Sequence, residues 1–579
     1  MLKPVKMNRI RPLILAASVI LAALLAYGLF TMPFPKGEDA EGFSAARVVK
    51  DIEVMSVEPH SVAHPEARAR VREYLVGRLQ GLGADTVRIF SYDSLVGPKN
   101  KHVIYTFDAH NILAEFQPAE PSASKAELMF VAHYDSRYSQ PFGRDTVWSY
   151  GAADDGYGVG VVLETVSQLL KEREQWKQGV KVLFTDAEEP GMMGMTAMWE
   201  KDRQEFDNVG LMLNVEARGP WGPALLFEAC PGNSKVIDLY ASNARYPYTY
   251  SLTTVVYGFM PNFTDFTIVK DSIPGLNFST VADINRYHTH LDNFENISQK
   301  SIQHYGAQIL PLASAYLKSA DYADRDALKA EEDAVNFTIP ALGMFNFSKV
   351  GYTIVNVVIF VLFLLLFGLE GVRGRLNAKK VLLKSVTVLA SALGIMVLGS
   401  FISMVCCSIA DVPFKLFGTV QGVMFDNAAM ISSVVFMILL SVFIYMMVRS
   451  KAIRTESSGS FRDKSLTIAR NHAYNVLYGT LALLFVLSAA FLIALGENMM
   501  FLIPLAFATL AMILHHLTNL RIWLPLAVAL ILLHVFSFYY ALAMALTIGA
   551  LGAVMMLSFF SVMVIIPMAD IYLMPARKR

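Results

Sequence analysis

Hydrophobic positions divide the chain into two parts with different patterns. Between about residues 40 and 325, short apolar runs alternate with amphipathic segments, whereas from about residue 350 the apolar runs are long and nearly free of charge. A membrane-spanning helix needs about 20 predominantly apolar residues. The pattern therefore predicts a domain of strands and helices, followed by a domain that crosses the membrane several times.

The first part alternates between strand-like and helix-like segments. The predicted strands are 126–132, 180–185, 209–215 and 224–227, and the predicted helices are 158–173 and 298–319. Each of the first three strands ends in a cluster of polar residues. This order predicts an α/β fold, a mostly parallel sheet flanked by helices, with functional groups gathered beyond the carboxyl ends of the strands.

The second part predicts an α-helical multi-span transmembrane domain. Including a first span near the N-terminus, the predicted spans are 13–32, 350–368, 385–408, 428–448, 474–496, 499–517 and two helices joined by a tight turn within 522–569. The first span reads as an uncleaved signal anchor, since no small-x-small cleavage site follows it. Basic residues follow alternate spans, so eight spans place every basic loop on one side, which is the cytoplasmic side by the positive-inside rule.

These patterns define the predicted domain organisation. The predicted segments are a cytoplasmic basic N-terminus 1–12, a transmembrane signal anchor 13–32, an extracytoplasmic catalytic domain 40–325, a linker 326–349, a seven-helix transmembrane domain 350–569 and a cytoplasmic basic tail 570–579.

Composition narrows the function classes. Only 17% of the residues are charged, against about a quarter in a typical soluble protein. The 49 Lys and Arg residues equal the 49 Asp and Glu residues in number, so no basic surface suggests a nucleic-acid partner. The three cysteines, Cys230, Cys406 and Cys407, provide neither a disulfide framework nor a cysteine zinc site. The predicted spans contain few ionisable residues, which does not favour a transporter.

Five polar segments contain the residue types of a metal centre. They are His133–Ser136, Gly151–Gly158, Asp186–Gly191, Asn214–Arg218 and Tyr287–Asp292. Imidazole and carboxylate groups suit zinc, and a carboxylate able to bridge permits a second ion. Each segment alone is also typical of a turn, a helix start or a solvated surface. Their joint occurrence in one domain, most of them at predicted strand ends, favours a metal-dependent hydrolase.

These segments resemble those of the di-zinc aminopeptidase family, which includes leucine aminopeptidases, glutamate carboxypeptidase II and glutaminyl cyclases. The resemblance covers most of residues 45–320. It is greatest for the membrane-bound branch that includes the vacuolar membrane protease and the endoplasmic reticulum metallopeptidase. The segments that resemble this branch in particular are Glu216–Gly219, Phe227–Asn233 and Ile273–Asn277.

The resemblance implies a zinc-peptidase fold, two Zn²⁺ ions and a set of residue roles. His133 and Glu216 would hold one ion, Glu189 and His288 the other, and Asp154 would bridge both. Glu188 would be the general base that deprotonates the attacking water and later protonates the leaving amine.

Further residues have supporting roles by the same resemblance or by position. Asp135 and Asp155 would orient His133 and its surroundings, and Tyr287 would form a hydrogen bond to the tetrahedral intermediate. The Asp154–Asp155 peptide bond is often cis in the family. Asp292 is expected to orient or cap rather than to bind metal.

The roles of two neighbouring residues stay open at this point. Arg218 could bind a substrate carboxylate or could pair with Glu228 as part of the structure. His290, two residues after His288, is expected at the surface or beside the ligands rather than as a second ligand of the same metal.

The predicted function is zinc-dependent hydrolysis of extracytoplasmic peptides, of the aminopeptidase type. The alternatives are a catalytically silent receptor or scaffold of the same fold, and acyl transfer of the glutaminyl cyclase type. The predicted partners are a peptide substrate and the lipid bilayer, with a homodimer as one arrangement of the membrane part. The bacterial plasma membrane is preferred over the endoplasmic reticulum or vacuole membrane. Five N-x-Ser/Thr sequons leave the secretory alternative open, at Asn262, Asn277, Asn296, Asn336 and Asn346.

Overall fold

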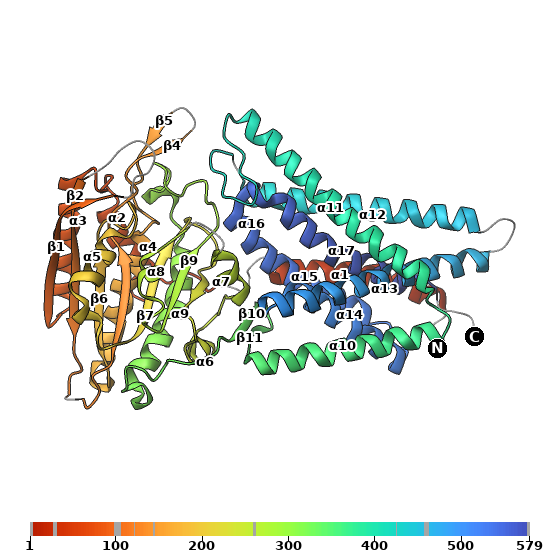
Figure 1. Ribbon diagram of the computed structural model, residues 1–579, viewed down its shortest axis with the longest axis horizontal. Helices are drawn as coiled ribbons and strands as arrows, with labels where there is room; N and C mark the ends of the chain where they lie inside the picture. The colour runs from red at the N-terminus through yellow and green to blue at the C-terminus, as the bar shows by residue number, and fades with distance from the viewer. Residues whose placement is uncertain are drawn as a thin grey trace. The chain divides into compact units, whose positions relative to one another are not determined.

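The computed structural model describes residues 4–26, 32–97, 106–120, 122–142, 145–258, 262–423, 425–456 and 462–575. The chain forms two compact units (Figure 1). The α/β unit comprises Phe30–Thr338 and Leu342–Lys349. The helical unit comprises Met1–Leu29, Ile339–Ala341 and Val350–Arg579.

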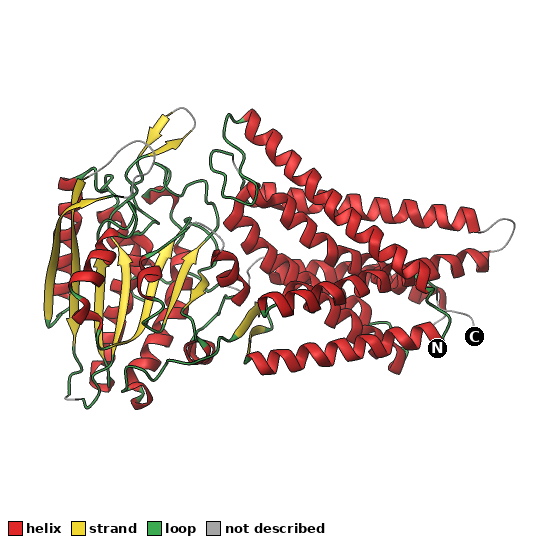
Figure 2. Ribbon diagram, viewed as in Figure 1, coloured by secondary structure: helices red, strands yellow, loops and turns green. Residues whose placement is uncertain are grey.

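A seven-stranded mixed sheet forms the centre of the α/β unit, with the strand order β1-β2-β6-β3-β7-β9-β8. Figure 2 shows the strands in yellow and the helices in red. The strands are β1 (Thr86–Val96), β2 (Thr106–Phe116), β3 (Glu127–His133), β6 (Gly179–Thr185), β7 (Val209–Ala217), β8 (Leu225–Ala229) and β9 (Gly275–Thr280). The four central strands β6, β3, β7 and β9 are parallel. In contrast, β2 is antiparallel to both β1 and β6, and β8 is antiparallel to β9.

Helices cover the sheet. Every residue of β3, β6 and β7 is buried, which a strand achieves only when both faces of the sheet are covered. The helices are α2 (Ala45–Met55), α3 (Pro65–Gly81), α4 (Gly156–Leu169), α5 (Met193–Lys201), α6 (Ser234–Asn243), α7 (Ser251–Gly258), α8 (Asp265–Val269) and α9 (Gln299–Lys318). Helices α2, α4 and α9 pack on one another, with α4 against β3 and β7, and α5 packs against β1, β2 and α8.

The predicted fold class is confirmed, with differences at the edges of the sheet. The predicted helix 158–173 is α4 followed by a 3-10 turn over Leu170–Gln175. The predicted strand 224–227 is β8, which lies at the edge and runs antiparallel to its neighbour. Two short ribbons accompany the main sheet: β4 (Gln140–Phe142) with β5 (Asp145–Val147), and β10 (Val335–Ile339) with β11 (Gly343–Phe347).

Long apolar helices make up the helical unit. They are α1 (Pro4–Leu24), α10 (Lys349–Val372), α11 (Ala378–Ile409), α12 (Asn427–Glu456), α13 (Arg462–Leu495), α14 (Met499–Thr518), α15 (Trp523–His534), α16 (Tyr540–Leu546) and α17 (Leu551–Leu573). In the described part of the chain, six helical segments between Lys349 and Leu573 are long and apolar enough to cross a bilayer. The apolar part of α1, Ile10–Leu24, is shorter, and residues 27–31 of the predicted first span lie outside the described residues.

The last apolar segment, Trp523–Leu573, is a hairpin rather than one helix. A π-helical turn joins α15 to α16, and the backbone leaves helical geometry at Thr547 (φ 55°, ψ −157°). Arg521, just before α15, donates to the carbonyl oxygen of Tyr572 near the end of α17 at 3.4 Å. The two ends of the segment are therefore together, so it contains the two antiparallel helices that its length predicts.

A polar network is buried inside the helical unit. The Tyr352 hydroxyl donates to Asn498 Oδ1 at 2.6 Å. Asn498 Nδ2 donates in turn to Asn356 Oδ1 at 2.6 Å and to Ser488 Oγ at 2.7 Å. All four side chains are fully or almost fully buried. The network ties the start of α10 to the turn between α13 and α14.

Basic residues from three separate segments meet at one end of the helical unit. Arg11 of α1 and Arg521 of the α14–α15 loop both donate to the carbonyl oxygen of Met574, Arg11 at 3.0 Å. Arg470 of α13 donates to the carbonyl oxygen of Pro575 at 2.8 Å. We call this group, at the carbonyl oxygens that follow α17, the basic end.

Ion pairs also join other helices of this unit near their ends. Arg449 of α12 pairs with Asp570 near the end of α17 at 2.9 Å. At the end of α10, the buried carboxylate of Glu370 pairs with Arg375 at 3.1 Å and with His516, in the last turn of α14, at 2.8 Å. These arginines come from the loops that the sequence predicts on one side of the membrane.

Candidate metal centre

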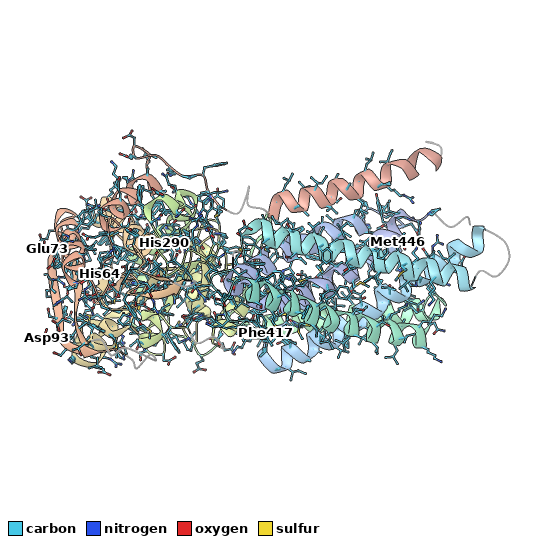
Figure 3. The ribbon with its side chains drawn as sticks, turned by 90° about the horizontal axis from the view of Figure 1, so that it is seen from above. His64, Glu73, Asp93, His290, Phe417 and Met446 are labelled. Atoms are coloured by element: carbon cyan, nitrogen blue, oxygen red, sulfur yellow. The ribbon has the colours of Figure 1, made fainter. Side chains whose placement is uncertain are left out.

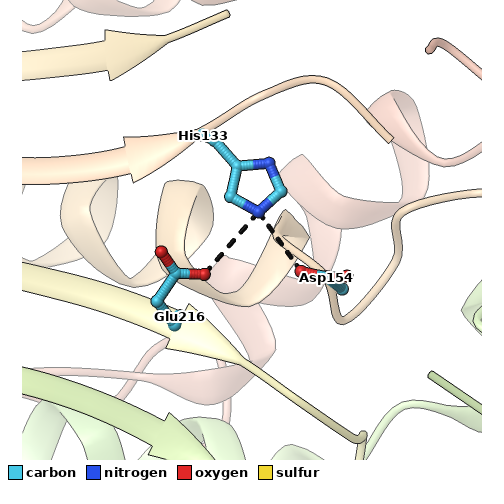
Figure 4. Close-up of side chains that lie close together, drawn as sticks. All are labelled: His133, Asp154 and Glu216. Atoms are coloured by element: carbon cyan, nitrogen blue, oxygen red, sulfur yellow. Dashed lines mark hydrogen bonds and ion pairs between the residues drawn. The ribbon is translucent and has the colours of Figure 1, made fainter. Parts of the chain in front are cut away.

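Two groups of carboxylate and imidazole side chains lie at the carboxyl ends of the parallel strands. The first contains His133, the last residue of β3, Glu216 near the end of β7, and Asp154 in the turn before α4 (Figure 4). His133 Nε2 lies 3.2 Å from Asp154 Oδ1 and 3.6 Å from Glu216 Oε2. All three residues are buried. They meet because β3 and β7 are adjacent parallel strands, whose carboxyl ends share one edge of the sheet.

The second group shares Asp154 with the first. His288 Nε2 lies 3.2 Å from Asp154 Oδ2 and 3.2 Å from Glu189 Oε2. Glu189 comes from the loop after β6, and His288 comes from the segment between β9 and α9, where its φ is +60°. In each group the three candidate ligand atoms lie within 4.8 Å of one another. Asp154 therefore presents one oxygen to each group.

The chemistry of these atoms fits a metal ion. Catalytic zinc sites use three imidazole or carboxylate ligands and keep one position open. His133 Nδ1 lies 2.9 Å from the carbonyl oxygen of Asp135, which holds the ring proton on Nδ1 and leaves Nε2 available as a ligand. Glu189 Oε1 is buried and accepts no hydrogen bond from the described residues. Such a buried, unsatisfied oxygen needs a partner, and a cation would provide one.

The electrostatics of the centre also favour a cation. Burial, reinforced by neighbouring carboxylates, raises the pKa of Glu216 to about 8 and the pKa of Glu188 well above its ordinary value. For Glu189, burial acts in the same direction, but His288 and Arg137 outweigh it and hold the pKa of this carboxyl below its ordinary value. The centre thus holds more buried acidic groups than its own basic groups neutralise, and a bound cation would relieve that imbalance.

Asp135 connects the two strand ends that carry the ligands. Its Oδ1 accepts a hydrogen bond from the backbone N–H of Glu188 at 2.9 Å, and its Oδ2 accepts one from the N–H of Glu189 at 3.3 Å. Its carbonyl oxygen faces His133. Asp135 therefore positions the loop after β6 relative to the histidine that ends β3.

Asp155 and Asp292 hold the turn that carries Asp154. Asp155 caps α4, since its Oδ1 accepts from the N–H of Gly158 at 3.0 Å, and its Oδ2 accepts from the N–H of His133 at 3.3 Å. Asp292 accepts from the N–H of Ala153 at 2.7 Å and from the N–H of Asp154 at 3.3 Å. The Asp154–Asp155 peptide bond is cis. Neither Asp155 nor Asp292 belongs to a ligand group within the described residues.

Tyr287 and Arg218 lie beside the second group. The Tyr287 ring stacks on the ring of His288 with centroids 3.6 Å apart, and Arg218 Cζ lies 5.9 Å from the Tyr287 ring centroid. Burial lowers the pKa of Arg218 and raises the pKa of Tyr287 well above its ordinary value. Both side chains therefore lie next to the ligand His288.

The structure bears on the two residues whose roles the sequence leaves open, Arg218 and His290. Glu228, the possible structural partner of Arg218, accepts from Lys270 at 2.6 Å and from Asn277 at 3.0 Å, so both of its carboxylate oxygens are engaged elsewhere. His290, labelled in Figure 3, is exposed, and the two ligand groups of the described residues do not include it.

Sequence reasoning missed two charged residues of the centre. Arg137 Nη1 donates to the carbonyl oxygen of Glu189 at 2.7 Å and to its Oε2 at 3.0 Å. Asp265, at the start of α8, is buried and accepts from the Thr185 hydroxyl, and burial raises its pKa to about 6. Arg137 lies two residues after Asp135 and directly follows the first polar segment, which is a usable signal. The helix start at Asp265 gives none.

A mixed sheet flanked by helices, with histidine and carboxylate groups at its strand ends, is an arrangement suited to holding metal ions. Residues 111–313 match Peptidase family M28, so the α/β unit contains a domain of this family of zinc-dependent metallopeptidases. The family resemblance predicted from the sequence is thereby confirmed. The matched residues lie in the α/β unit, and the six apolar helices follow them along the chain.

Curated relatives come from the membrane-bound branch. The vacuolar membrane protease of Candida dubliniensis is 26% identical over 330 residues, which are 55% of this chain and 32% of that protein. The endoplasmic reticulum metallopeptidase 1 of Rattus norvegicus is 26% identical over 284 residues, 48% of this chain and 30% of that protein. The matched part of the chain thus spans about a third of the length of these relatives.

Solved structures similar to about half of this chain include enzymes of two kinds. A glutaminyl cyclase from Porphyromonas gingivalis has a TM-score of 0.38 and 18% identity, covering 48% of this chain and 100% of that chain. A zinc aminopeptidase from Bacillus subtilis has a TM-score of 0.36 and 14% identity, covering 50% of this chain and 99% of that chain.

Proposed function

We propose that the protein is a membrane-bound aminopeptidase that uses two zinc ions to hydrolyse peptides outside the cytoplasm. The observation that carries the proposal is the sharing of Asp154 between two histidine–carboxylate groups. His133 and Glu216 would hold one ion, Glu189 and His288 the other, and Asp154 both. When bound, the ions would polarise the scissile carbonyl group and lower the pKa of the attacking water.

Glu188 is proposed as the general base. It is partly exposed, follows β6 beside Glu189, and lies outside both ligand groups. Its backbone N–H is fixed by Asp135. A carboxylate in this position can accept a proton from the attacking water and deliver it to the leaving amine.

The residues around the ligands would select and orient the peptide. A free N-terminal amine would be attracted by the acidic side chains of Glu188, Glu189 or Glu216. The Tyr287 hydroxyl would donate to the oxygen on which negative charge develops. Arg218, stacked over Tyr287, would bind the carboxylate of a short peptide.

The α/β unit is proposed to face away from the cytoplasm, with the helical unit as its anchor, alone or as a homodimer. The basic end supports this orientation, because arginines from three separate segments gather at one end of the helical unit. We prefer a bacterial plasma membrane over the endoplasmic reticulum or vacuole membrane. Two of the five sequons support this, since Asn277 and Asn336 are buried and could not carry glycans in the folded chain.

The direct test is hydrolysis of aminoacyl reporter substrates by the purified full-length protein in detergent. Activity should disappear with a chelator and return with zinc. Glu188→Gln should lower kcat by at least about a hundredfold, as loss of a general base does. Glu200→Gln makes the same chemical change on the exposed face of α5 and should leave activity unchanged. Full activity of Glu188→Gln, or activity that persists without metal, would overturn the proposed mechanism.

Substrate variants separate the aminopeptidase from its alternatives. An Nα-acetylated reporter should not be cleaved, because it has no free amine. A peptide with an N-terminal glutamine should yield free glutamine rather than a cyclised product and ammonia. Cyclisation would favour the glutaminyl cyclase reaction, and zinc content without any turnover would favour a silent receptor.

A further inference from the structure

A cleft lies in the α/β unit, away from the metal centre. Its volume is about 480 Å³, within the range of about 300–1,000 Å³ that is usual for small-molecule sites. Residues Asp271–Pro274, which immediately precede β9, form one wall. The metal centre lies at the opposite edge of the sheet, beyond the carboxyl ends of the parallel strands. The six residues of β9 separate the two edges by about 20 Å.

Basic side chains dominate the lining of this cleft. Four of them, Arg203, Lys270, Arg325 and Lys329, face a single acidic lining residue, Asp271. The two lysines already have carboxylate partners outside the lining. Lys270 pairs with Glu228 at 2.6 Å, and Lys329 pairs with Asp326 at 2.8 Å.

The two arginines are poorly neutralised by comparison. The Arg203 guanidinium lies over the Trp199 ring, 3.5 Å from the centroid. Arg325 Nε is buried and has no hydrogen-bond partner among the described residues, and the Asp326 carboxylate lies 4.0 Å from it. An unsatisfied buried donor on a cation is unfavourable. The planar guanidinium group is suited to bind the paired oxygens of a phosphate or carboxylate.

The walls of the cleft are fixed by the fold. The loop after β8 and the loop before β10 approach so closely at Gly232 (φ +66°) that a Cβ there would lie 2.0 Å from the Ala330 carbonyl oxygen. The N–H of Gly232 donates to Asp333 Oδ1 at 2.7 Å, and the N–H of Ser234 donates to the Glu332 carbonyl oxygen at 3.1 Å. These contacts set the spacing of the two loops before any ligand binds.

We propose that this cleft binds a small molecule with a phosphate or carboxylate group, held mainly by Arg203 and Arg325. Two cations with spare hydrogen-bond donors, in a cleft larger than a bare anion needs, indicate a small organic anion rather than a simple ion. The site is separate from the metal centre, so its ligand would not compete with a peptide substrate. The proposal is independent of the proposed peptidase function.

Binding can be tested on the full-length protein in detergent with inorganic phosphate and succinate as probes. Sodium chloride at matched ionic strength controls for screening. Hydrogen–deuterium exchange should slow in residues 230–234 and 325–330 as a saturable function of probe concentration. Saturation by phosphate alone, by succinate alone or by both would support the proposal and identify the group that is bound. No saturable protection of these segments by either probe would overturn it.

Variants assign the interaction to the arginines. Arg325→Gln and Arg203→Gln should each weaken binding about tenfold or more, whereas Arg70→Gln, an exposed arginine on α3, should not. Arg203 is exposed, so its variant tests the proposal even if Arg325→Gln fails to fold. Unchanged affinity in Arg203→Gln combined with unchanged affinity in folded Arg325→Gln would exclude the site, as would protection confined to residues 133–136 of the metal centre.

Discussion

Asp154 lies between His133 and His288, 3.2 Å from a ring nitrogen of each. Each of its carboxylate oxygens faces a different histidine, whereas Glu216 and Glu189 each face only one. Asp292 and the cap formed by Asp155 fix the turn on which Asp154 stands. Loss of Asp154 should therefore affect both ligand groups, whereas loss of a histidine or glutamate should affect only one.

The zinc content of variants should reveal this difference between Asp154 and the other ligands. The wild-type chain is expected to hold two zinc ions, and His133→Ala or His288→Ala should each retain about one, because three-ligand sites fail when the histidine is lost. Asp154→Asn should hold less than one, since both sites lose an anionic ligand. Elemental analysis after dialysis measures the stoichiometry, with Glu200→Gln as the control. Two ions retained in Asp154→Asn would contradict the shared role.

At the scale of elements, α4 begins directly at the centre and has no space at its third residue. A Cβ on Gly158 would lie 2.2 Å from Asp155 Oδ2 and 2.4 Å from the Val215 carbonyl oxygen. The first is the carboxylate that holds His133, and the second belongs to the residue before Glu216. The packing of α4 on β7 is thus coupled to the ligands of one group.

Gly158→Ala should therefore lower both stability and zinc content. We expect a loss of roughly 3 kcal/mol in the free energy of unfolding, as for overpacking against backbone. The matched control is Gly77→Ala in α3, where a Cβ meets nothing within 4 Å and where alanine should stabilise the helix by up to about 1 kcal/mol. Denaturant unfolding followed by tryptophan fluorescence compares the two. Equal free energies of unfolding for the two variants would show that the structure accommodates a Cβ at Gly158 with little loss of stability.

Helix α9 carries a buried histidine whose charge state affects stability. His304 Nδ1 accepts from the N–H of Ala224 at 2.9 Å, and its Nε2 donates to the Tyr246 carbonyl oxygen at 2.9 Å. Burial lowers the pKa of His304 to about 4 from 6.5. The unfolded chain therefore binds the proton more readily than the folded chain.

Stability should fall as the pH drops from 6.5 towards 4, with about 2 kcal/mol lost from this residue by pH 5. This loss of stability is complete below pH 4 and absent above pH 7. His304→Gln retains a donor and an acceptor but does not titrate in this range. The pH-dependent loss measured between pH 7 and pH 5 should therefore shrink by that amount in the variant. An unchanged pH profile would show that other groups control it.

The sequence predicted strands β3, β6, β7 and β8 and missed strands β1, β2 and β9. Strands β3, β6 and β7 are apolar runs because helices cover both faces. In β1, exposed and partly buried residues predominate, so no apolar run marks it. β9 is buried but contains polar Asn277, Ser279 and Thr280, whose partners are distant in sequence.

The same reason explains which site residues could be predicted. His133, Glu216 and the Glu188–Glu189 pair follow or end apolar runs, so the sheet topology brings them together. Arg137 adjoins the first polar segment, whereas Asp265 reaches the centre through helix geometry that local sequence does not encode.

At the scale of the whole molecule, the basic end is the feature that bears on orientation. Arg11, Arg470 and Arg521 come from three separate segments and meet at the carbonyl oxygens of Met574 and Pro575. The positive-inside rule places such a cluster at the cytoplasmic surface. In the proposed orientation, a reagent added outside the cell should therefore reach the α/β unit but not the loops at the basic end.

Cysteine labelling tests this orientation in a background with Cys406 and Cys407 replaced by alanine, since Cys230 is buried. A membrane-impermeant maleimide should label Glu331→Cys, in an exposed loop of the α/β unit, on intact cells. Lys379→Cys, exposed at the start of α11, should react only after permeabilisation. The reverse order of labelling would contradict the proposed orientation.

The network around Asn498 has a consequence for how the chain enters the membrane. Asn356 lies within α10, and its side-chain oxygen accepts from Asn498, which is synthesised 142 residues later. Until then, α10 carries an amide into hydrocarbon without that partner, which is costly. We expect α10 to stay with the insertion machinery until the α13–α14 turn emerges. Nascent chains that stop before Asn498 should therefore be removed by quality-control proteases faster than chains that extend beyond α14.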